Sequence, residues 1–244
     1  MDAKMTTLGF LYPGFGAEDD YPFMQTLVPS GVTLNLIHTS VGVDAHEVDA
    51  LLDLGKSERL LEGAESLRAS APGAVMWACT SGSFVFGLDG AKQQADEVGA
   101  ALGVPASSTS LAFVDAIRHL GVTKVAIAAT YPEDVSRHFR QLLEDADITV
   151  VSLVSHDIET AALAGELDDD GVVELAESNN PEDAEVVLLP DTAMHTARLV
   201  PRLEASLGKP VLTANQVTLW QAMRLAGVLD TIPAMGTLFQ PANH

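Results

Sequence analysis

The amino-acid sequence predicts an α/β protein with open parallel sheets, arranged as two halves of similar order. Two observations predict it: short apolar segments alternate with helical patterns, and four features of the first half recur in order in the second. Strand–helix alternation favours right-handed βαβ units. With 244 residues, of which 47% are hydrophobic, the chain is long enough for one large domain or two smaller ones.

Eight segments have the length and composition of strands. They are short, rich in Val, Ile and Leu and almost wholly apolar, which is typical of parallel strands covered on both faces. Helical patterns lie between several of them, for example over Asp49–Arg68 and Pro132–Asp145. The predicted strands are Leu8–Tyr12, Thr33–His38, Val75–Ala78, Val104–Ser107, Val125–Ala129, Thr149–Val154, Val186–Leu189 and Val211–Thr213.

A weak internal repeat links the two halves. Because hydrophobic strands resemble one another, chance similarity is the alternative to a duplication. If the halves do face each other, residues that end matching strands meet in one cleft, since ligands bind beyond the carboxyl ends of parallel strands. The matching pairs, in chain order, are Tyr12 and Tyr131, His38 and His156, Cys79 and Asp191, and Pro105 and Pro210.

The charge and the cysteine count exclude several classes of protein. A net charge of −21, from 34 acidic and 13 basic residues, repels nucleic acids and anionic membranes. One cysteine excludes an internal disulfide and a cysteine-rich zinc site. The N-terminal segment lacks an apolar signal-peptide core and no apolar run is long enough to span a membrane, so we expect a cytoplasmic protein.

The segment Trp77–Ser83 (WACTSGS) is the strongest local signal for chemistry. Cys79 ends a strand before small residues that can begin a helix, so free backbone N–H groups should surround its sulfur. Such donors predict a thiol pKa below the ordinary ~8.5. With the Thr80 and Ser81 hydroxyls they could also hold a carboxylate without an arginine. The alternative is a buried structural cysteine.

Asp191 ends the matching strand of the second half and is followed by Thr192. Facing Cys79 across a cleft, its carboxyl group could donate or accept a proton if burial raises its pKa. The alternative is a helix N-cap, worth ~1 kcal/mol. Tyr131 is either a donor to a substrate carboxylate or a structural tyrosine.

Nucleotide and metal motifs are missing from the sequence. The glycines Gly14 and Gly16 lack the third glycine of a dinucleotide loop, and there is no phosphate-binding Gly-Lys-Ser/Thr. His46 and Glu47 do not form an HExxH motif, and no Gly-x-Ser-x-Gly elbow is present. The sequence therefore predicts no cofactor and no metal.

Three segments together resemble the Asp/Glu racemase superfamily, in its branch of maleate cis–trans isomerases and arylmalonate decarboxylases. They are Ala78–Ser83 (ACTSGS), Ala129–Val135 (ATYPEDV) and Leu207–Gln216 (LGKPVLTANQ), with Trp220 beyond them. The resemblance implies two pseudo-symmetric Rossmann-like (flavodoxin-like) half-domains, each with a short parallel sheet flanked by helices and with the active site between them. We expect residues 1–112 plus 215–244 in the first half-domain and 113–214 in the second.

The resemblance also implies site residues. Cys79 matches the first of two family cysteines, and Asp191 with Thr192 stands where the second is expected. Tyr131, Thr80 and Ser81 match positions that contact the substrate carboxylate. The N-terminal loop departs from the pattern, because a substrate-binding asparagine is missing there. Pro13 and Gly14 of this loop complete the candidate substrate-binding set.

The sequence favours a cofactor-independent isomerase of a small (di)carboxylic acid, similar to maleate cis–trans isomerase, with Cys79 as nucleophile or acid–base group and Asp191 as its partner. An arylmalonate-type decarboxylase or a racemase with Cys79 as proton donor is the first alternative. A non-catalytic protein that binds a small carboxylate is the second. The expected partner is a small carboxylate substrate, and the oligomeric state stays open, a homo-oligomer included.

Overall fold

The computed structural model describes residues 5–14, 16–228 and 230–241. Residues 1–4 of the N-terminal segment, Phe15 of the loop after the first strand, Leu229 and residues 242–244, all in the first predicted half-domain, lie outside this range. Two four-stranded parallel sheets are present, with the orders β2-β1-β3-β4 and β6-β5-β7-β8. The strands are β1 (Thr6–Tyr12), β2 (Val32–His38), β3 (Ala74–Trp77), β4 (Ala106–Ser108), β5 (Lys124–Ala129), β6 (Thr149–Ser155), β7 (Val186–Leu189) and β8 (Val211–Thr213).

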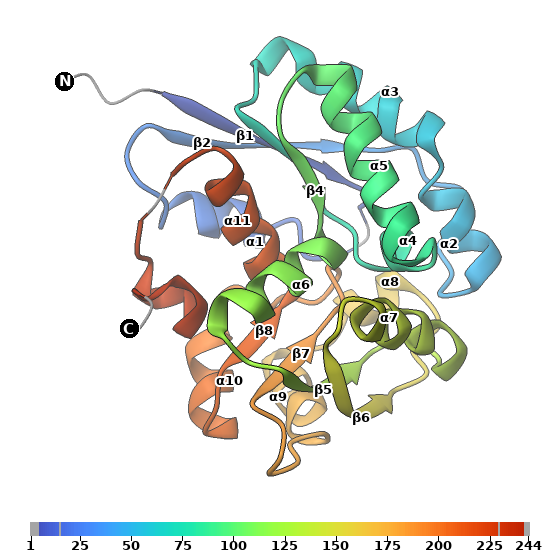
Figure 1. Cartoon of the computed structure of the whole chain (residues 1–244), viewed down its shortest axis with the longest axis vertical. Helices are drawn as coiled ribbons and strands as arrows, with labels where there is room; N and C mark the ends of the chain where they lie inside the picture. Colours follow the sequence, from blue (N-terminus) through green and yellow to red (C-terminus); the bar gives the residue numbers. More distant parts are fainter. Residues whose placement is uncertain (1–4, 15, 229, 242–244) are drawn as a thin grey trace.

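All eight predicted strands and the α/β fold class are confirmed. Figure 1 shows the first sheet in the upper part of the molecule and the second in the lower part, with α4 and α8 where the two meet. The helices are α1 (Asp20–Gln25), α2 (Val48–Leu54), α3 (Ser57–Leu67), α4 (Ser81–Phe84), α5 (Gly87–Leu102), α6 (Thr109–Leu120), α7 (Glu133–Asp145), α8 (Ala161–Gly165), α9 (Asp169–Glu177), α10 (Val200–Leu207) and α11 (Ala214–Leu225), with 3-10 turns at Arg68–Ser70, Pro233–Met235 and Thr237–Phe239.

The predicted segments form both the inner and the edge strands of the two sheets. Strands β3 and β7 are buried along their whole length, as continuous apolar runs in parallel sheets should be. The larger core fills the first half and its junction with the second, and a smaller one packs β5 and β7 against α9 and α10. Within the described residues, no helix is both long and apolar enough to cross a membrane.

The two sheets repeat each other in detail as well as in order. Pro105 precedes β4 and its carbonyl accepts from Val75 N at 3.0 Å, and Pro210 precedes β8 and accepts from Val187 N at 3.2 Å. The last residues of β4 and β8 are the N-caps of α6 and α11. Helix α11 follows the second sheet but packs on β3 and β4 of the first and on α6. The boundaries at residues 112 and 214 stay a prediction.

The single helix expected over Asp49–Arg68 is wrong, because the chain breaks between α2 and α3 at Gly55. At this point Gln94 Nε2 donates to the carbonyls of Gly55 (2.7 Å) and Gly82 (2.9 Å). A Cβ atom on Gly55 would lie only 2.0 Å from Gly82 O, so this approach requires glycine. The helix break at Gly55 therefore lets the Gln94 side chain link this segment to the turn that follows β3. The second expected helix is confirmed as α7, with Pro132 as its N-cap.

The order of the strands places both candidate catalytic residues at equivalent positions. In each sheet the chain runs from an inner strand to one edge and returns to the other side, so the order reverses between β1 and β3 and between β5 and β7. Ligands bind at such reversals, beyond the carboxyl ends of the strands. Cys79 lies two residues beyond β3, and Asp191 lies two residues beyond β7.

Candidate active site

Cys79 lies in a tight turn between β3 and the short helix α4. Ala78 N donates to Leu11 O at 2.8 Å, which extends the sheet to the residue before the cysteine. Gly82 N donates to Cys79 Sγ at 3.3 Å, and Ser81 Oγ lies 3.8 Å from the same sulfur. The predicted cluster of donors around the thiol is therefore present.

The prediction of a lowered thiol pKa is wrong. Cys79 is 3% exposed, and its burial raises the thiol pKa to about 11. The hydrogen bonds from Gly82 and Ser81 lower the pKa, but by less than burial raises it, and the negative charge of Asp191 raises it further. Helix α4 has only four residues, so its dipole offers little compensation. In this structure the resting group is a neutral thiol that can donate a proton.

We expect the ultraviolet absorbance of the Cys79 thiolate to titrate with a midpoint near pH 11. An ordinary thiol is half ionised near pH ~8.5, so the alkylation rate with iodoacetamide should still be rising tenfold per pH unit well above that value. The matched baseline is Cys79→Ser, since the chain has one cysteine. A midpoint below pH ~8.5 would show that the donors outweigh burial.

Asp191 is held by two hydrogen bonds in the matching turn of the second half. Thr130 Oγ1 donates to Oδ2 at 2.5 Å, and Ala193 N donates to Oδ1 at 2.9 Å. The carboxyl group is 3% exposed. The N-cap alternative is wrong, because no helix begins here and α10 starts only at Val200. The bond to Ala193 N instead closes a local turn of the kind that Asp favours.

Cys79 and Asp191 line one narrow cavity between the two halves. Four of the predicted substrate-binding residues, Pro13, Gly14, Ser81 and Thr192, line it as well. Its lining combines polar and apolar side chains, and no lysine or arginine is among the described residues that line it. The remaining lining residues, most of which sequence reasoning missed, are Val41, Val43, Asp44, Ala45, His46, Leu51, Leu54, Ala161 and Ala193.

Thr80 and Tyr131 lie behind this cavity and do not line it. Thr80 is fully buried. The Tyr131 hydroxyl donates to Pro190 O at 3.1 Å, next to Asp191. Burial raises the pKa of Tyr131 well above its usual value, so the hydroxyl stays a donor. Their contact with a substrate carboxylate stays a prediction.

The segment that follows β2 covers the cavity and is attached to the other half. Asp44 accepts from Ala161 N at 2.9 Å and from Ala162 N at 3.1 Å, so its carboxylate holds the first turn of α8. His46 N donates to Glu159 O at 2.7 Å. These contacts join residues more than 110 positions apart, which is why no local pattern in the sequence predicted them.

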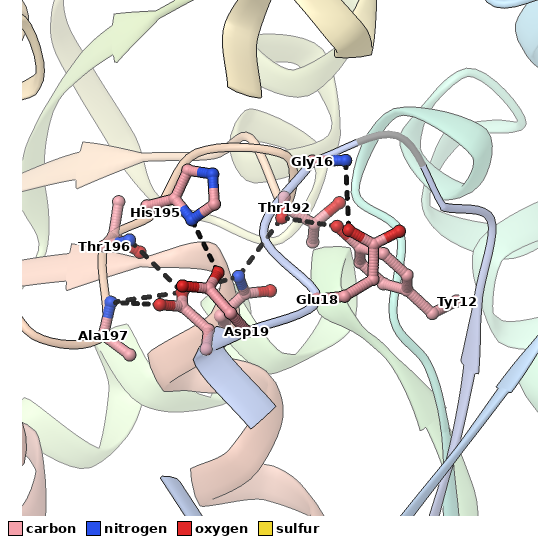
Figure 2. Close-up of polar contacts among 10 residues, drawn as sticks. Tyr12, Gly16, Glu18, Asp19, Thr192, His195, Thr196 and Ala197 are labelled. Atoms are coloured by element: carbon pink, nitrogen blue, oxygen red, sulfur yellow. Dashed lines mark hydrogen bonds and ion pairs between the residues drawn. The ribbon is translucent and has the colours of Figure 1, made fainter. Parts of the chain in front are cut away.

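The loop after β1 closes the opposite side of the site against the Asp191 turn (Figure 2). The Tyr12 hydroxyl donates to Thr192 O at 3.1 Å. Asp20, which is buried, accepts from Asn215 Nδ2 at 2.9 Å and from the backbone N–H groups of Thr196 and Ala197. Burial raises the pKa of Asp20, while these three donors lower it. The network aligns the Asp191 turn on the first half-domain.

No group of three or more His, Cys, Asp or Glu side chains in the described ranges is arranged to hold a metal ion.

Comparison with known proteins gives a consistent set of similarities. A family model described as arylmalonate decarboxylase matches residues 43–239. The arylmalonate decarboxylase of Bordetella bronchiseptica is 29% identical over 142 residues, which is 57% of this chain and 59% of that protein. The chain thus matches less than two thirds of this relative.

Two solved structures resemble the whole chain. The maleate isomerase from Pseudomonas putida S16 has a TM-score of 0.89 at 17% identity and covers 98% of this chain and 100% of its own. A Nocardia farcinica maleate cis–trans isomerase with a covalently bound succinylcysteine intermediate has a TM-score of 0.84 at 19% identity, covering 96% and 98%. At these identities the two structures establish the two-domain fold.

Proposed function

This chain belongs to the arylmalonate decarboxylase family, and from that premise we propose that it is a cofactor-independent isomerase of a small unsaturated carboxylic acid, similar to maleate isomerase. One observation carries the proposal: Cys79 and Asp191 line the same cavity from equivalent strand ends of the two halves. A thiol opposite a carboxylate can add to a double bond and leave again, with the carboxylate holding the proton.

The proposed reaction has three steps. Cys79 Sγ bonds to one alkene carbon, the π electrons move into the adjacent carboxylate to give an enediolate, and Asp191 takes the thiol proton. The former double bond then rotates as a single bond. Finally the C–S bond breaks, the electrons restore the alkene in the trans form, and the proton returns to sulfur. Ser81, which lines the cavity and whose Oγ lies 3.8 Å from Cys79 Sγ, is the nearby donor for the enediolate oxygens.

Two observations favour decarboxylation of a substituted malonate as a second candidate. A thiol with a pKa of about 11 is protonated at neutral pH and can deliver a proton to an enediolate carbon. The apolar lining residues Val41, Val43, Leu51 and Leu54 offer a departing carboxylate no hydrogen-bond donor from their side chains. In this reaction the C–C bond breaks, carbon dioxide leaves with neither electron of that bond, and Cys79 protonates the remaining carbon.

Incubation in deuterated water separates the two reactions. With maleate we expect conversion to the trans acid without deuterium on carbon, because the shuttled proton returns to sulfur. With phenylmalonate, decarboxylation would release carbon dioxide and place one deuterium on the product. If neither acid reacts while succinate still binds, the chain is a carboxylate-binding protein and the enzymatic proposal fails.

The remaining parts of the proposal rest on composition. The charge of −21 argues against nucleic-acid and anionic-membrane partners. A free cysteine, with no other cysteine in the chain, fits a reducing compartment such as the cytoplasm. The substrate class is a small carboxylate, and a homo-oligomer is compatible with these features.

A further inference from the structure

The imidazole of His46 is fixed in one orientation beside the cavity. Its Nδ1 lies 2.7 Å from Ile158 O, and a carbonyl oxygen can only accept, so Nδ1 carries the hydrogen. The ring meets the Tyr131 ring edge-on, with centroids 4.7 Å apart and planes at 82°. His46 is 4% exposed, and in the described part of the chain its Nε2 has no partner. The free nitrogen therefore offers a lone pair or, once protonated, a charged N–H.

The cavity is lined by two carboxylates, although the proposed ligand is itself an anion. Asp44 and Asp191 both line it, and each has both carboxylate oxygens already engaged by hydrogen bonds within the protein. These carboxylates repel an entering anion. Among the described lining residues, His46 is the one side chain that can become positively charged.

We propose that His46 binds a carboxylate group of the substrate through Nε2 and takes up one proton from solvent as the anion enters. This inference rests on the proposed function, because it assumes that the cavity takes a carboxylate. The carboxylate stays ionised, Nε2 gains the proton, and no bond to carbon changes. The resulting N–H···O bond is charge-assisted and lies in a site shielded from water, where such bonds are strongest.

Several ionisable groups lie around the His46 imidazole and determine the local charge at the site where it would be protonated. Asp44 and Glu47 lie on the same segment, Tyr131 and Asp134 come from the end of β5 and the start of α7, and Glu159 precedes α8; across the cavity are Cys79 and Asp191. All of them are neutral or negative in the relevant range. Protonation of His46 therefore reduces the net negative charge around the cavity, and no other positive group lies close enough to oppose it among those named.

The test measures proton uptake during binding of succinate, a dicarboxylate with no double bond to react. Calorimetric titration near neutral pH in phosphate and in Tris, whose ionisation enthalpies differ, gives the number of protons bound. We expect about one proton per succinate for the native protein. The variant His46→Asn keeps an N–H for Ile158 O but lacks Nε2, and we expect it to take up none and to bind about 10- to 100-fold more weakly.

Two further variants serve as controls. His46→Gln places a neutral donor near the Nε2 position, so it should regain part of the affinity without proton uptake. His119→Gln, on α6 beside Trp220, should behave like the native protein in both measurements. Thermal unfolding of each variant checks that the fold is kept.

Proton-free binding of succinate by the native protein, no binding at all, or unchanged uptake in His46→Asn would each overturn the inference. Failure of the enzymatic proposal looks different. It would appear as succinate binding with proton uptake in a protein that neither isomerises maleate nor decarboxylates phenylmalonate. Normal turnover with proton-free binding would leave the enzymatic proposal intact and remove His46 from it.

Discussion

Replacing Cys79 by serine should lower turnover at least ~100-fold, which is the scale of losing a general acid or a nucleophile. Serine keeps an atom that can accept from Gly82 N, so the turn before α4 should form as before. The hydroxyl is a far weaker acid and a poorer nucleophile than the thiol. Steady-state kinetics with whichever acid the native enzyme converts would measure the loss, most of it in kcat.

The controls separate chemistry from packing. Cys79→Ser should unfold within a few degrees of the native protein and should bind succinate with similar affinity, because neither property needs a reactive sulfur. Cys79→Ala, which also removes the hydrogen-bond acceptor, should show the same loss of turnover. Near-native turnover in either variant would exclude Cys79 from the mechanism.

Replacing Asp191 by asparagine should lower turnover about 10- to 100-fold, because the amide cannot hold the proton that the thiol releases. The shape is conserved: the amide oxygen can still accept from Ala193 N, and the amide N–H can donate to Thr130 Oγ1. The variant also has a second, independent effect. Since the Asp191 charge raises the pKa of Cys79, its removal should lower that pKa below the native value of about 11.

The pair of readouts distinguishes a proton acceptor from a structural carboxylate. A lowered thiol pKa with unchanged turnover would restrict Asp191 to shaping its turn. In the double variant with Cys79→Ala, the loss of turnover should be close to that of Cys79→Ala alone, because two groups that act on one proton fail together. Additive losses would contradict the shared step.

The fold was predictable because its signals are local. The inner strands β3 and β7 are continuous apolar runs, and the pairs Pro105 with Pro210 and Cys79 with Asp191 lie at equivalent positions in the two sheets. A residue that directly follows a parallel strand must lie at the carboxyl edge of its sheet. The sequence could therefore place Cys79 and Asp191 in one cleft without any knowledge of the packing around them.

The electrostatics of the site depended on contacts that no local pattern reports. The thiol pKa rises because the sulfur is buried, and this effect outweighs the hydrogen bonds from Gly82 and Ser81. Asp44 and His46 enter the site through bonds to the α8 region, more than 110 residues away. The break at Gly55 likewise depends on Gly82, which approaches it only in the folded chain. Each of these points depends on contacts between residues that are distant in the sequence.

The two halves share one topology but end their matching strands in different chemical groups. Identical groups facing each other would treat the two sides of a flat molecule alike. Here a thiol lies at one strand end and a carboxylate at the other, so the two faces of a bound planar molecule meet different groups although the two sheets have the same strand order. The duplicated scaffold is chemically asymmetric at its centre.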